Sequence, residues 1–291
     1  MAPRVTRNDL AMSAVVLLWG ANFTAIRVAL DEIPPLTFTA IRFTLASVAL
    51  WGLLRLREGS AGFPPGTGWR MVWLGVVGNT AYQTLFVAGL ARTTVANASL
   101  LLATSPVMVA LGAGLLRVER VSRQVAAGIA LAFAGASVIL LGRGAAIGRE
   151  TILGDLLVWG AAACWAAYTL GLRKLGRDVS PLRVTTLTTI TGTPGLVLAA
   201  LPEWDGVAWA GIGAAGWLGL GYSTVLALIL AYFLWNESVR QVGGSRTAVY
   251  VCAVPLVAML IAWPTLGEAP TGLALLGASL IVGGLLLARR T

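Results

Sequence analysis

Ten separate stretches of this 291-residue chain are each long and apolar enough to cross a lipid bilayer. A hydrocarbon core about 30 Å thick needs roughly 20 residues of helix at a rise of about 1.5 Å per residue. We place the spans near residues 10–30, 35–54, 70–91, 94–116, 122–142, 152–174, 181–201, 211–236, 244–265 and 271–288. The sequence therefore predicts an all-α polytopic membrane protein with ten transmembrane helices.

Composition supports a chain that resides in the bilayer and excludes several other classes. The apolar share is 57%, the charged share is 11% and the mean hydropathy is +0.83. There is no histidine, and Cys164 and Cys252 each stand alone in an apolar run, so we expect no metal site, no disulfide and no cofactor. The net charge of +9 comes from basic residues scattered singly between apolar segments, which argues against nucleic acid as a partner.

Basic residues near the helix ends predict the orientation of the chain, because Lys and Arg concentrate on the cytoplasmic side. With the N-terminus inside, sixteen basic residues lie at the inside ends of the spans, and four, Arg27, Arg92, Arg143 and Arg149, lie at the outside ends. This bias and the even number of spans place both termini in the cytoplasm. The first apolar run is too long for a signal peptide, so we expect it to be retained as a helix.

The chain contains an internal repeat, which predicts two five-helix units, residues 1–145 and 146–291. A shift of 146 residues pairs Trp19 with Trp165 and Pro35 with Pro181, and a shift of 149 pairs Pro106 with Pro255 and Glu119 with Glu268. Because each unit has an odd number of spans, the second unit enters the membrane from the opposite face. Such inverted repeats are typical of secondary carriers, in which one cavity opens alternately to each side. The alternative is that duplicated helices merely pack well.

Several stretches resemble a known family. LLWGANFTAIRVAL, PLTFTAIRF, NASLLLATSPVMVALGAGLLRVE, GDLLVWGAAACWAAYTLGLRKL and YFLWNESVRQVGGSRTAVYVCAVPLVAMLIAWPTLGE are similar to the EamA repeats of the drug/metabolite transporter superfamily. The resemblance spans nearly the whole chain, one repeat in each half. It implies the export of small metabolites across the bacterial inner membrane, and the amino-acid exporters of the YddG type are the nearest members.

All twelve acidic residues lie at segment ends, so no carboxylate stands in the middle of a span. An intramembrane acid is the usual proton relay or cation counter-ion. The related small multidrug exporters keep a glutamate in their first helix, where this chain has Asn22. The difference argues against cationic drugs as substrates and against proton coupling through a carboxylate.

Arg42 is the one clearly intramembrane charge, about two turns into the second span, where it needs partners. It either holds a neighbouring helix by bonding carbonyl groups or faces the cavity and meets a substrate carboxylate. Members of the family often carry an arginine here, and the equivalent residue of the second half is Thr188. We therefore favour the structural interpretation.

Three helix faces carry polar and aromatic residues at helical spacing, and a polar stripe on a membrane helix must face inward. The candidate substrate-binding residues on the first, third and sixth spans are Trp19, Asn22, Asn79, Tyr82, Gln83, Trp165 and Tyr168, and Asn97, Leu101, Tyr222 and Tyr250 are additional walls. The alternative is that the amides bridge helices and the aromatic rings form interfacial belts. A pocket with aromatic walls and few amides suits a neutral or zwitterionic, partly apolar solute.

Two pairs of equivalent residues have expected roles in the scaffold. Pro106 and Pro255 are candidate gates or hinges, because proline kinks a helix, although a fixed bend is an equal alternative. Glu119 and Glu268, at the end of the fourth helix of each unit, are expected to cap the next helix or to pair with arginines.

These observations lead to one hypothesis, an exporter of neutral or aromatic amino acids that works by alternating access and has no catalytic residues. The expected partners are a small-molecule substrate and the lipid bilayer, and we expect a monomer while leaving an oligomer open. The alternatives are export of another metabolite or drug-like solute, or a passive channel. A membrane enzyme is disfavoured because only Arg42 and carboxylates at the span ends are available for chemistry.

Overall fold

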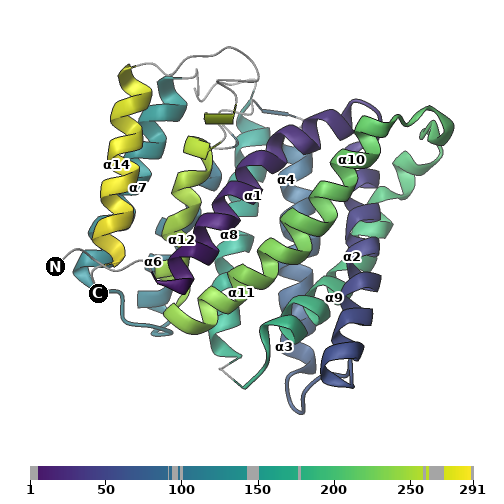
Figure 1. Ribbon diagram of the computed structural model, residues 1–291, viewed down its shortest axis with the longest axis horizontal. Coiled ribbons are helices and arrows are strands. Elements are labelled where there is room, and N and C mark those ends of the chain that lie inside the picture. The colour runs from purple at the N-terminus through teal and green to yellow at the C-terminus, as the bar shows by residue number, and fades with distance from the viewer. Residues whose placement is uncertain are drawn as a thin grey trace.

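The computed structural model describes residues 6–90, 92–93, 98, 101–142, 151–175, 178–257, 260–261 and 272–289. Every regular element among these residues is helical (Figure 1). Five helices in this part of the chain are long and apolar enough to cross a membrane, over 7–30, 35–58, 152–174, 181–204 and 214–242. The described part of the chain is thus all-helical, and several of its helices have the length and composition of membrane spans.

The helices overlap the windows of high hydropathy in both halves. In the first half they are α1 (Arg7–Leu30), α2 (Pro35–Glu58), α3 (Gly68–Gly75), η1 (Val76–Ala81), α4 (Tyr82–Leu90), α6 (Ser105–Leu115) and α7 (Arg123–Gly142). In the second half they are α8 (Ile152–Lys174), α9 (Pro181–Trp204), η2 (Trp209–Gly211), α10 (Ala214–Tyr222), η3 (Ser223–Leu230), α11 (Ala231–Val242), α12 (Gly244–Ala248), η4 (Val249–Ala253) and α14 (Gly272–Arg289).

Local sequence signals set several helix ends. Thr6 and Asp9 form a capping box at the start of α1, in which each side chain accepts a hydrogen bond from the backbone N–H of the other residue. Pro35 and Pro181 stand at the first position of α2 and α9, where their fixed φ suits a helix and no N–H is needed. Gly59 ends α2 with a φ of 71°, a conformation that favours glycine.

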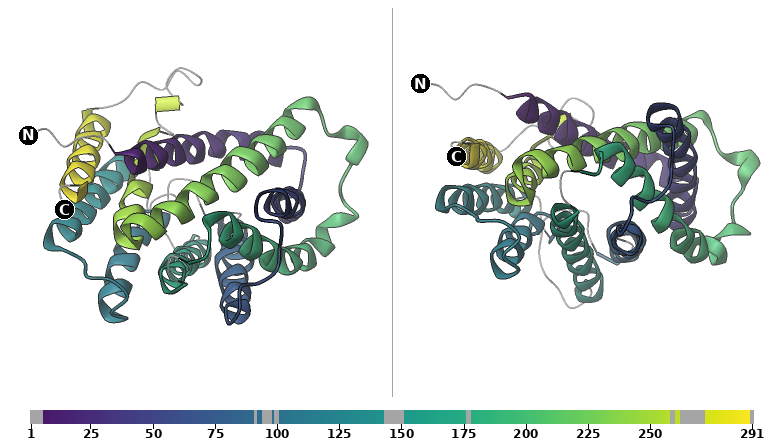
Figure 2. Two further views of the ribbon diagram at one scale, coloured as in Figure 1. Left: turned by 60° about the horizontal axis from the view of Figure 1, so that its bottom comes forward. Right: turned by 90° about the horizontal axis from the view of Figure 1, so that it is seen from below.

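The helices α7 and α14 lie side by side at one edge of the molecule, in all the ribbon views (Figures 1 and 2). Their backbones touch at glycines: a Cβ added to Gly128 would lie 2.6 Å from the carbonyl oxygen of Gly284, and one added to Gly135 would lie 2.5 Å from that of Gly277. The later glycine of α7 contacts the earlier glycine of α14, so the two helices are antiparallel. Small residues permit this close approach, as in other membrane helix pairs.

The helices α2 and α9 form a second close pair, held by side-chain hydroxyl groups. Thr186 Oγ1 donates to the carbonyl of Leu50 and Thr193 Oγ1 donates to the carbonyl of Phe43, each at 3.4 Å. The hydroxyl groups of Ser47 and Thr193 lie 2.9 Å apart. The later threonine of α9 contacts the earlier residue of α2, so this pair of helices is antiparallel too.

Two long helices contain π-helical segments at corresponding points. The segment η1 joins α3 to α4, and η3 joins α10 to α11, so each run continues without a break. The segments begin at Val76 and Ser223, which are 147 residues apart. A π segment shifts the helix faces on either side of it relative to each other and is common at functional sites.

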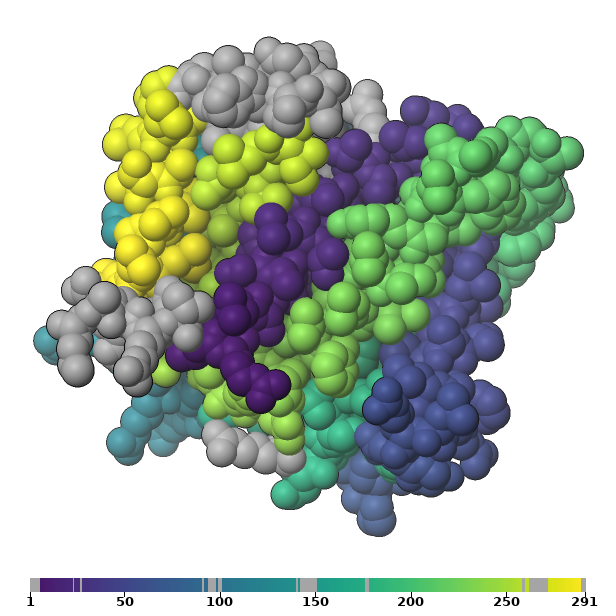
Figure 3. All heavy atoms as spheres, viewed as in Figure 1, coloured from purple at the N-terminus to yellow at the C-terminus, as the bar shows by residue number. Residues whose placement is uncertain are grey.

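The outer surface is apolar, as a surface in contact with lipid requires. Leu56, Leu115 and Leu198 are 86%, 83% and 66% exposed. Figure 3 shows α1 crossing one face diagonally, next to α10 and α11, which it contacts. The aromatic and polar residues that face inward come from these helices and from α2, α4, α8 and α9, which positions the site described next.

Candidate functional site

Five aromatic rings gather around Trp165 in the middle of α8, and we call these six residues the aromatic cluster. The other members are Trp19 from α1, Tyr82 from α4, Tyr168 from α8, and Tyr232 and Trp235 from α11. Their ring centroids lie 5.2–5.7 Å from that of Trp165, which is 6% exposed. Phe86 stacks on Tyr82 at 6.1 Å. Rings at such distances attract one another in tilted and edge-to-face arrangements.

Helical spacing and one glycine determine where the rings of the aromatic cluster lie. Trp165 and Tyr168 share a face of α8 at positions i and i+3, and Tyr232 and Trp235 do so on α11. A Cβ added to Gly78, in η1, would lie 2.2 Å from the ring of Tyr168, so only glycine lets this ring approach the third span.

Tyr168 anchors the cluster to a polar chain on its other side. Its hydroxyl donates to Asn236 Oδ1 at 3.0 Å, and Asn236 Nδ2 donates to Thr185 Oγ1 at 2.8 Å. Tyr168 and Thr185 are fully buried and Asn236 is 4% exposed. The chain therefore links α8, α11 and α9 through satisfied hydrogen bonds.

Arg42 reaches the cluster through Gln83. Arg42 Nη2 donates to Gln83 Oε1 at 3.0 Å, and Gln83 Nε2 lies 3.5 Å from the hydroxyl oxygen of Tyr232. The guanidinium carbon lies 5.6 Å from the ring centroid of Phe38 and 5.4 Å from that of Phe43. The favoured expectation that Arg42 ties helices together is consistent with this geometry, although its described hydrogen bond goes to a side-chain amide rather than to a carbonyl of the backbone.

Arg42 and Gln83 also line a cavity of about 180 Å³ between α1, α2 and α4, which we call the Arg42 cavity. Its walls are Ile26 and Leu30 from α1, Pro35, Phe38, Thr39 and Arg42 from α2, and Gln83, Phe86, Val87 and Leu90 from α4. The lining is almost entirely apolar apart from the guanidinium, one amide and one hydroxyl.

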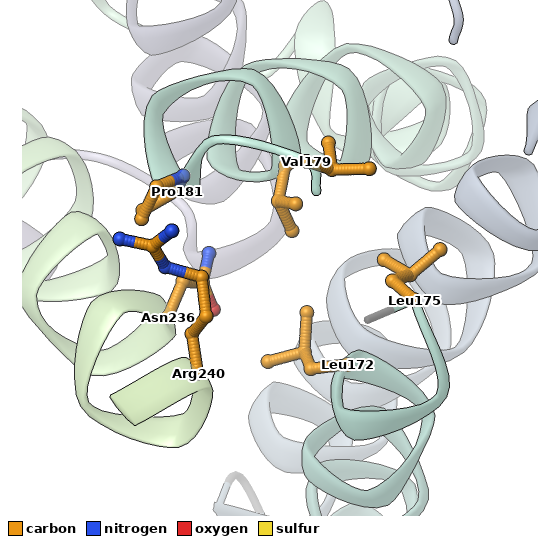
Figure 4. Close-up of a pocket in the computed structure, with 7 residues that line it drawn as sticks. Leu172, Leu175, Val179, Pro181, Asn236 and Arg240 are labelled. Carbon is orange, nitrogen blue, oxygen red and sulfur yellow. The ribbon is translucent and has the colours of Figure 1, made fainter. Parts of the chain in front are cut away.

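A second, smaller cavity of about 20 Å³ lies between the C-terminal end of α8, the start of α9 and the C-terminal half of α11 (Figure 4). We call it the Arg240 cavity. Its walls are Leu172, Leu175, Val179, Pro181, Val184, Asn236 and Arg240. The volume is enough for about one water molecule. The aromatic cluster contacts lining residues of both cavities, since Tyr168 bonds Asn236 of the Arg240 cavity, and Tyr232 and Tyr82 contact Gln83 and Phe86 of the Arg42 cavity.

Two other predicted site residues, Asn22 and Asn79, each make a hydrogen bond to another helix, while the buried Oδ1 of Asn79 has no partner. Asn22 Oδ1 accepts from Ser223 Oγ at 2.7 Å, and Asn79 Nδ2 donates to the carbonyl of Thr188 at 2.7 Å. The Asn79 bond joins η1 to α9 in the way the helix-bridging alternative describes.

Two of the predicted tyrosines make similar bonds. The Tyr222 hydroxyl donates to the carbonyl of Leu18 at 3.1 Å, and the Tyr250 hydroxyl donates to Asp9 Oδ1. Leu101 is half-buried next to the turn before α6. Asn97 lies outside the described residues.

Pro106 and Pro255 are both buried, and each follows irregular backbone. Pro106 stands in the first turn of α6, directly after a turn at residues 103–104, and Pro255 follows the 3-10 segment η4. Among the described residues, no three His, Cys, Asp or Glu side chains lie close enough together to hold a metal ion.

Three residues of the eighth span that contact the site were not among the predicted site residues, which included only Tyr222 from this span. Tyr232, Trp235 and Asn236 occupy positions i, i+3 and i+4 of α11, the spacing that pointed to the faces of the first, third and sixth spans. The stretch YFLWNE holds this signal, and Tyr232 stands 149 residues after Gln83, one of the two repeat offsets.

Comparisons with known proteins identify a family of transporters and a solved structure with a similar fold. The model of the EamA-like transporter family matches residues 6–141 and again residues 152–290. A protein of Streptantibioticus cattleyicolor named "Probable terminal-alkyne amino-acid exporter" is 32% identical over 284 residues, 96% of this chain and 92% of that protein. An uncharacterized transporter of Archaeoglobus fulgidus is 30% identical over 287 residues and covers 97% of both chains. A solved crystal structure superposes with a TM-score of 0.82 at 23% identity, over 97% of this chain and 96% of that one.

Proposed function

Because this chain belongs to the EamA-like transporter family, we propose that it exports small metabolites, with neutral or aromatic amino acids as the substrate class, by alternating access. Transport is the activity that its relatives' names describe. The observation that supports this substrate class and mechanism is the aromatic cluster. It lies where helices of both halves meet, and it contacts lining residues of the Arg42 cavity and of the Arg240 cavity.

A contact between equivalent residues supports an inverted repeat of residues 1–145 and 146–291. Ser47 and Thr193 are 146 residues apart, and their hydroxyl groups touch. A residue that touches its own repeat partner lies on the axis that relates the two units. Since α2 and α9 are antiparallel, that axis is perpendicular to the helices, which means it lies in the membrane plane.

The two glycine contacts of α7 and α14 obey the same symmetry. A shift of 149 residues turns Gly128 into Gly277 and Gly135 into Gly284, so the contact of Gly128 with Gly284 and that of Gly135 with Gly277 are exchanged with each other. Such a pair of units can exchange conformations, and this exchange would expose a central site to each side of the membrane in turn.

The aromatic cluster supplies the barrier that alternating access needs. Trp19 and Trp165, which the shift of 146 residues relates, meet edge to face with centroids 5.7 Å apart. Since Tyr232 contacts a lining residue of the Arg42 cavity and Tyr168 contacts one of the Arg240 cavity, we infer that the rings separate the two cavities. Because the rings come from both halves, a rocking motion of one half against the other would separate them.

The size and the lining of the Arg42 cavity suit a small, partly apolar solute. Its volume of about 180 Å³ is close to the cavity of about 150 Å³ that holds one benzene. Pockets for drug-sized ligands measure about 300–1,000 Å³. The Streptantibioticus cattleyicolor relative, whose name describes an amino-acid exporter, points to the same substrate class.

Counterflow in proteoliposomes tests this function. We expect liposomes with the purified protein, preloaded with unlabelled phenylalanine, to accumulate labelled phenylalanine with saturable kinetics, because a carrier must bind one solute per conformational cycle. A passive channel, the second candidate, would give flux that rises linearly with concentration. The absence of counterflow with any amino acid in a panel would reject the substrate class.

A substitution in the aromatic cluster tests the position of the transport path. We expect Trp165→Ala to let labelled phenylalanine leak from the liposomes without a counter-solute and to lower its accumulation by counterflow, because removal of the central ring opens the barrier between the two cavities. Trp159→Ala is the matched control, since Trp159 is on the same helix and 50% exposed. Equal kinetics in the two variants would place the path elsewhere.

A further inference from the structure

We propose that Arg42 binds the carboxylate of a small solute in the Arg42 cavity, and that Gln83 positions the guanidinium for it. This inference rests on the proposed function for the identity of the ligand as transport substrate.

The charge of Arg42 is unbalanced. The residue is 6% exposed, and no Asp or Glu among the described residues lies within 4 Å of its guanidinium nitrogens. Of the five N–H donors of the guanidinium, one makes a described hydrogen bond, from Nη2 to Gln83, and the buried Nε has no partner. A buried charge without a counter-ion is costly inside a membrane protein, so an anion in the adjacent cavity would be stabilised strongly.

The lining of the cavity selects which anion fits. Besides Arg42, its polar side chains are those of Gln83 and Thr39. Gln83 Oε1 accepts from Arg42, and Thr39 Oγ1 donates to the carbonyl of Pro35 at 2.9 Å. The vacant groups are thus donors on the guanidinium, whose planar fork matches a carboxylate. The remaining walls, such as Phe38, Phe86 and Leu90, suit a short apolar or aromatic substituent.

The guanidinium is held in place without being neutralised. It lies over the ring of Phe38 at 5.6 Å and near that of Phe43 at 5.4 Å, and both contacts attract a cation through the π face. The hydrogen bond to Gln83 fixes its orientation from α4. A rigid donor loses less entropy on binding than a free side chain, and this favours affinity.

The second half has no equivalent charge, so the carboxylate has one docking point. The repeat partner of Arg42 is Thr188, whose hydroxyl donates to the carbonyl of Val184 at 2.8 Å and whose carbonyl accepts from Asn79. A pseudo-symmetric transporter with a single anchoring charge binds its substrate in one orientation. The apolar part of the solute would then point towards Phe86 and, beyond it, Tyr82 of the aromatic cluster.

Binding of two matched probes tests the assignment by isothermal titration calorimetry on protein in lipid nanodiscs. The probes are phenylpropionate and its neutral isostere phenylpropionamide. We expect the wild type to bind the carboxylate more tightly than the amide, and Arg42→Gln to lower the affinity for the carboxylate by about 10- to 100-fold, the range for hydrogen bonds to charged groups. The affinity for the amide should stay the same. Arg55→Gln is the control, because Arg55 is exposed on the same helix and its guanidinium lies over Trp51.

A second variant guards against a folding defect in Arg42→Gln. Arg42→Lys keeps the charge but not the planar fork, so we expect weaker binding of phenylpropionate with a preference for it over the amide still present. Equal affinity of the wild type for the two probes, no binding of phenylpropionate, or a preference that survives in Arg42→Gln would each overturn the assignment.

Counterflow of labelled phenylalanine on the same preparations separates the two proposals. Binding of phenylpropionate that depends on Arg42, without counterflow, would support this site and reject the proposed function alone. Saturable counterflow in a protein that binds the two probes equally would reject the Arg42 site and leave the proposed function in place.

Discussion

Glu119 joins the two halves of the molecule through backbone hydrogen bonds. Its carboxylate accepts from the N–H of Gly244 at 3.0 Å and from that of Ser245 at 2.7 Å, and Oε2 lies 3.8 Å from Nε of Arg173. The expected cap and arginine pair are therefore present at Glu119, but the capped helix is α12 of the second half rather than the next helix along the chain. Its repeat partner Glu268 lies outside the described residues.

Removal of this cap should destabilise the protein. We expect Glu119→Ala to lower the stability by about 1–3 kcal/mol, because the N–H groups of Gly244 and Ser245 lose their acceptor. The measurement is the midpoint of thermal unfolding in detergent. Glu237→Ala is the control, since Glu237 pairs with Arg240 on its own helix, and pairs one turn apart on a helix contribute about 0.3–0.5 kcal/mol. Equal midpoints in the two variants would contradict the capping role.

The conformation of Gly243 explains why Glu119 can come so close. Gly243 precedes α12 with a φ of 97°, and a Cβ there would lie 2.5 Å from Glu119 Oε2. Glycine is the one residue that adopts this φ without strain and leaves the carboxylate its space. The stretch VGG in the sequence contains this turn, but the partner carboxylate stands more than a hundred residues earlier in the chain.

At the scale of the elements, the interrupted helices carry the site. The π segments η1 and η3 end directly before α4 and α11, whose first two residues include Tyr82, Gln83 and Tyr232. The extra width of a π turn rotates these side chains relative to the helix that precedes them. No proline marks either segment, so hydropathy alone predicted uninterrupted helices there.

The contact between α7 and α14 depends on glycine at particular positions. We expect Gly284→Ala to destabilise the protein by about 1–3 kcal/mol, because its Cβ would lie 2.5 Å from the carbonyl oxygen of Gly128. The neighbouring Gly283→Ala is the matched control, since its Cβ would meet Leu131 at an ordinary 3.5 Å. That change should be neutral or gain up to about 1 kcal/mol of helix propensity. Thermal unfolding of both variants in detergent compares them, and a smaller loss for Gly284 than for Gly283 would contradict the close contact.

At the scale of the whole molecule, α1 begins and α14 ends at the same end of the helix bundle (Figure 1). An even number of crossings between them requires this arrangement. The excess of basic residues at the ends of the spans that we placed inside predicts that this end is cytoplasmic.

Reporter fusions test this orientation. We expect a fluorescent-protein fusion after residue 291 to be fluorescent and an alkaline phosphatase fusion at the same point to be inactive, because the distribution of basic residues predicts that both termini lie in the cytoplasm. A phosphatase fusion in the loop at Asp205–Ala208, between α9 and η2, should be active, and one at Gly62, between α2 and α3, should be inactive. The reverse pattern would mean that the chain is inserted the other way round.

The sequence by itself determined where the helices lie and which faces of several helices point inward. The reason is physical and local: a bilayer has a fixed thickness, and every polar group within it must be satisfied inside the protein. Trp19, Tyr82, Trp165 and Tyr168 were predicted from spacing alone, and the structure brings all four into one cluster.

Only the tertiary structure decided which side chains meet. The contacts of Arg42 with Gln83, of Asn79 with Thr188 and of Glu119 with Gly244 join positions 41 to 125 residues apart. Such contacts depend on the rotation of each helix about its axis and on glycines that set the distance between backbones, and hydropathy encodes neither. For the same reason the vacant donors of Arg42 and the apolar cavity beside them became visible only once α1, α2 and α4 were packed together.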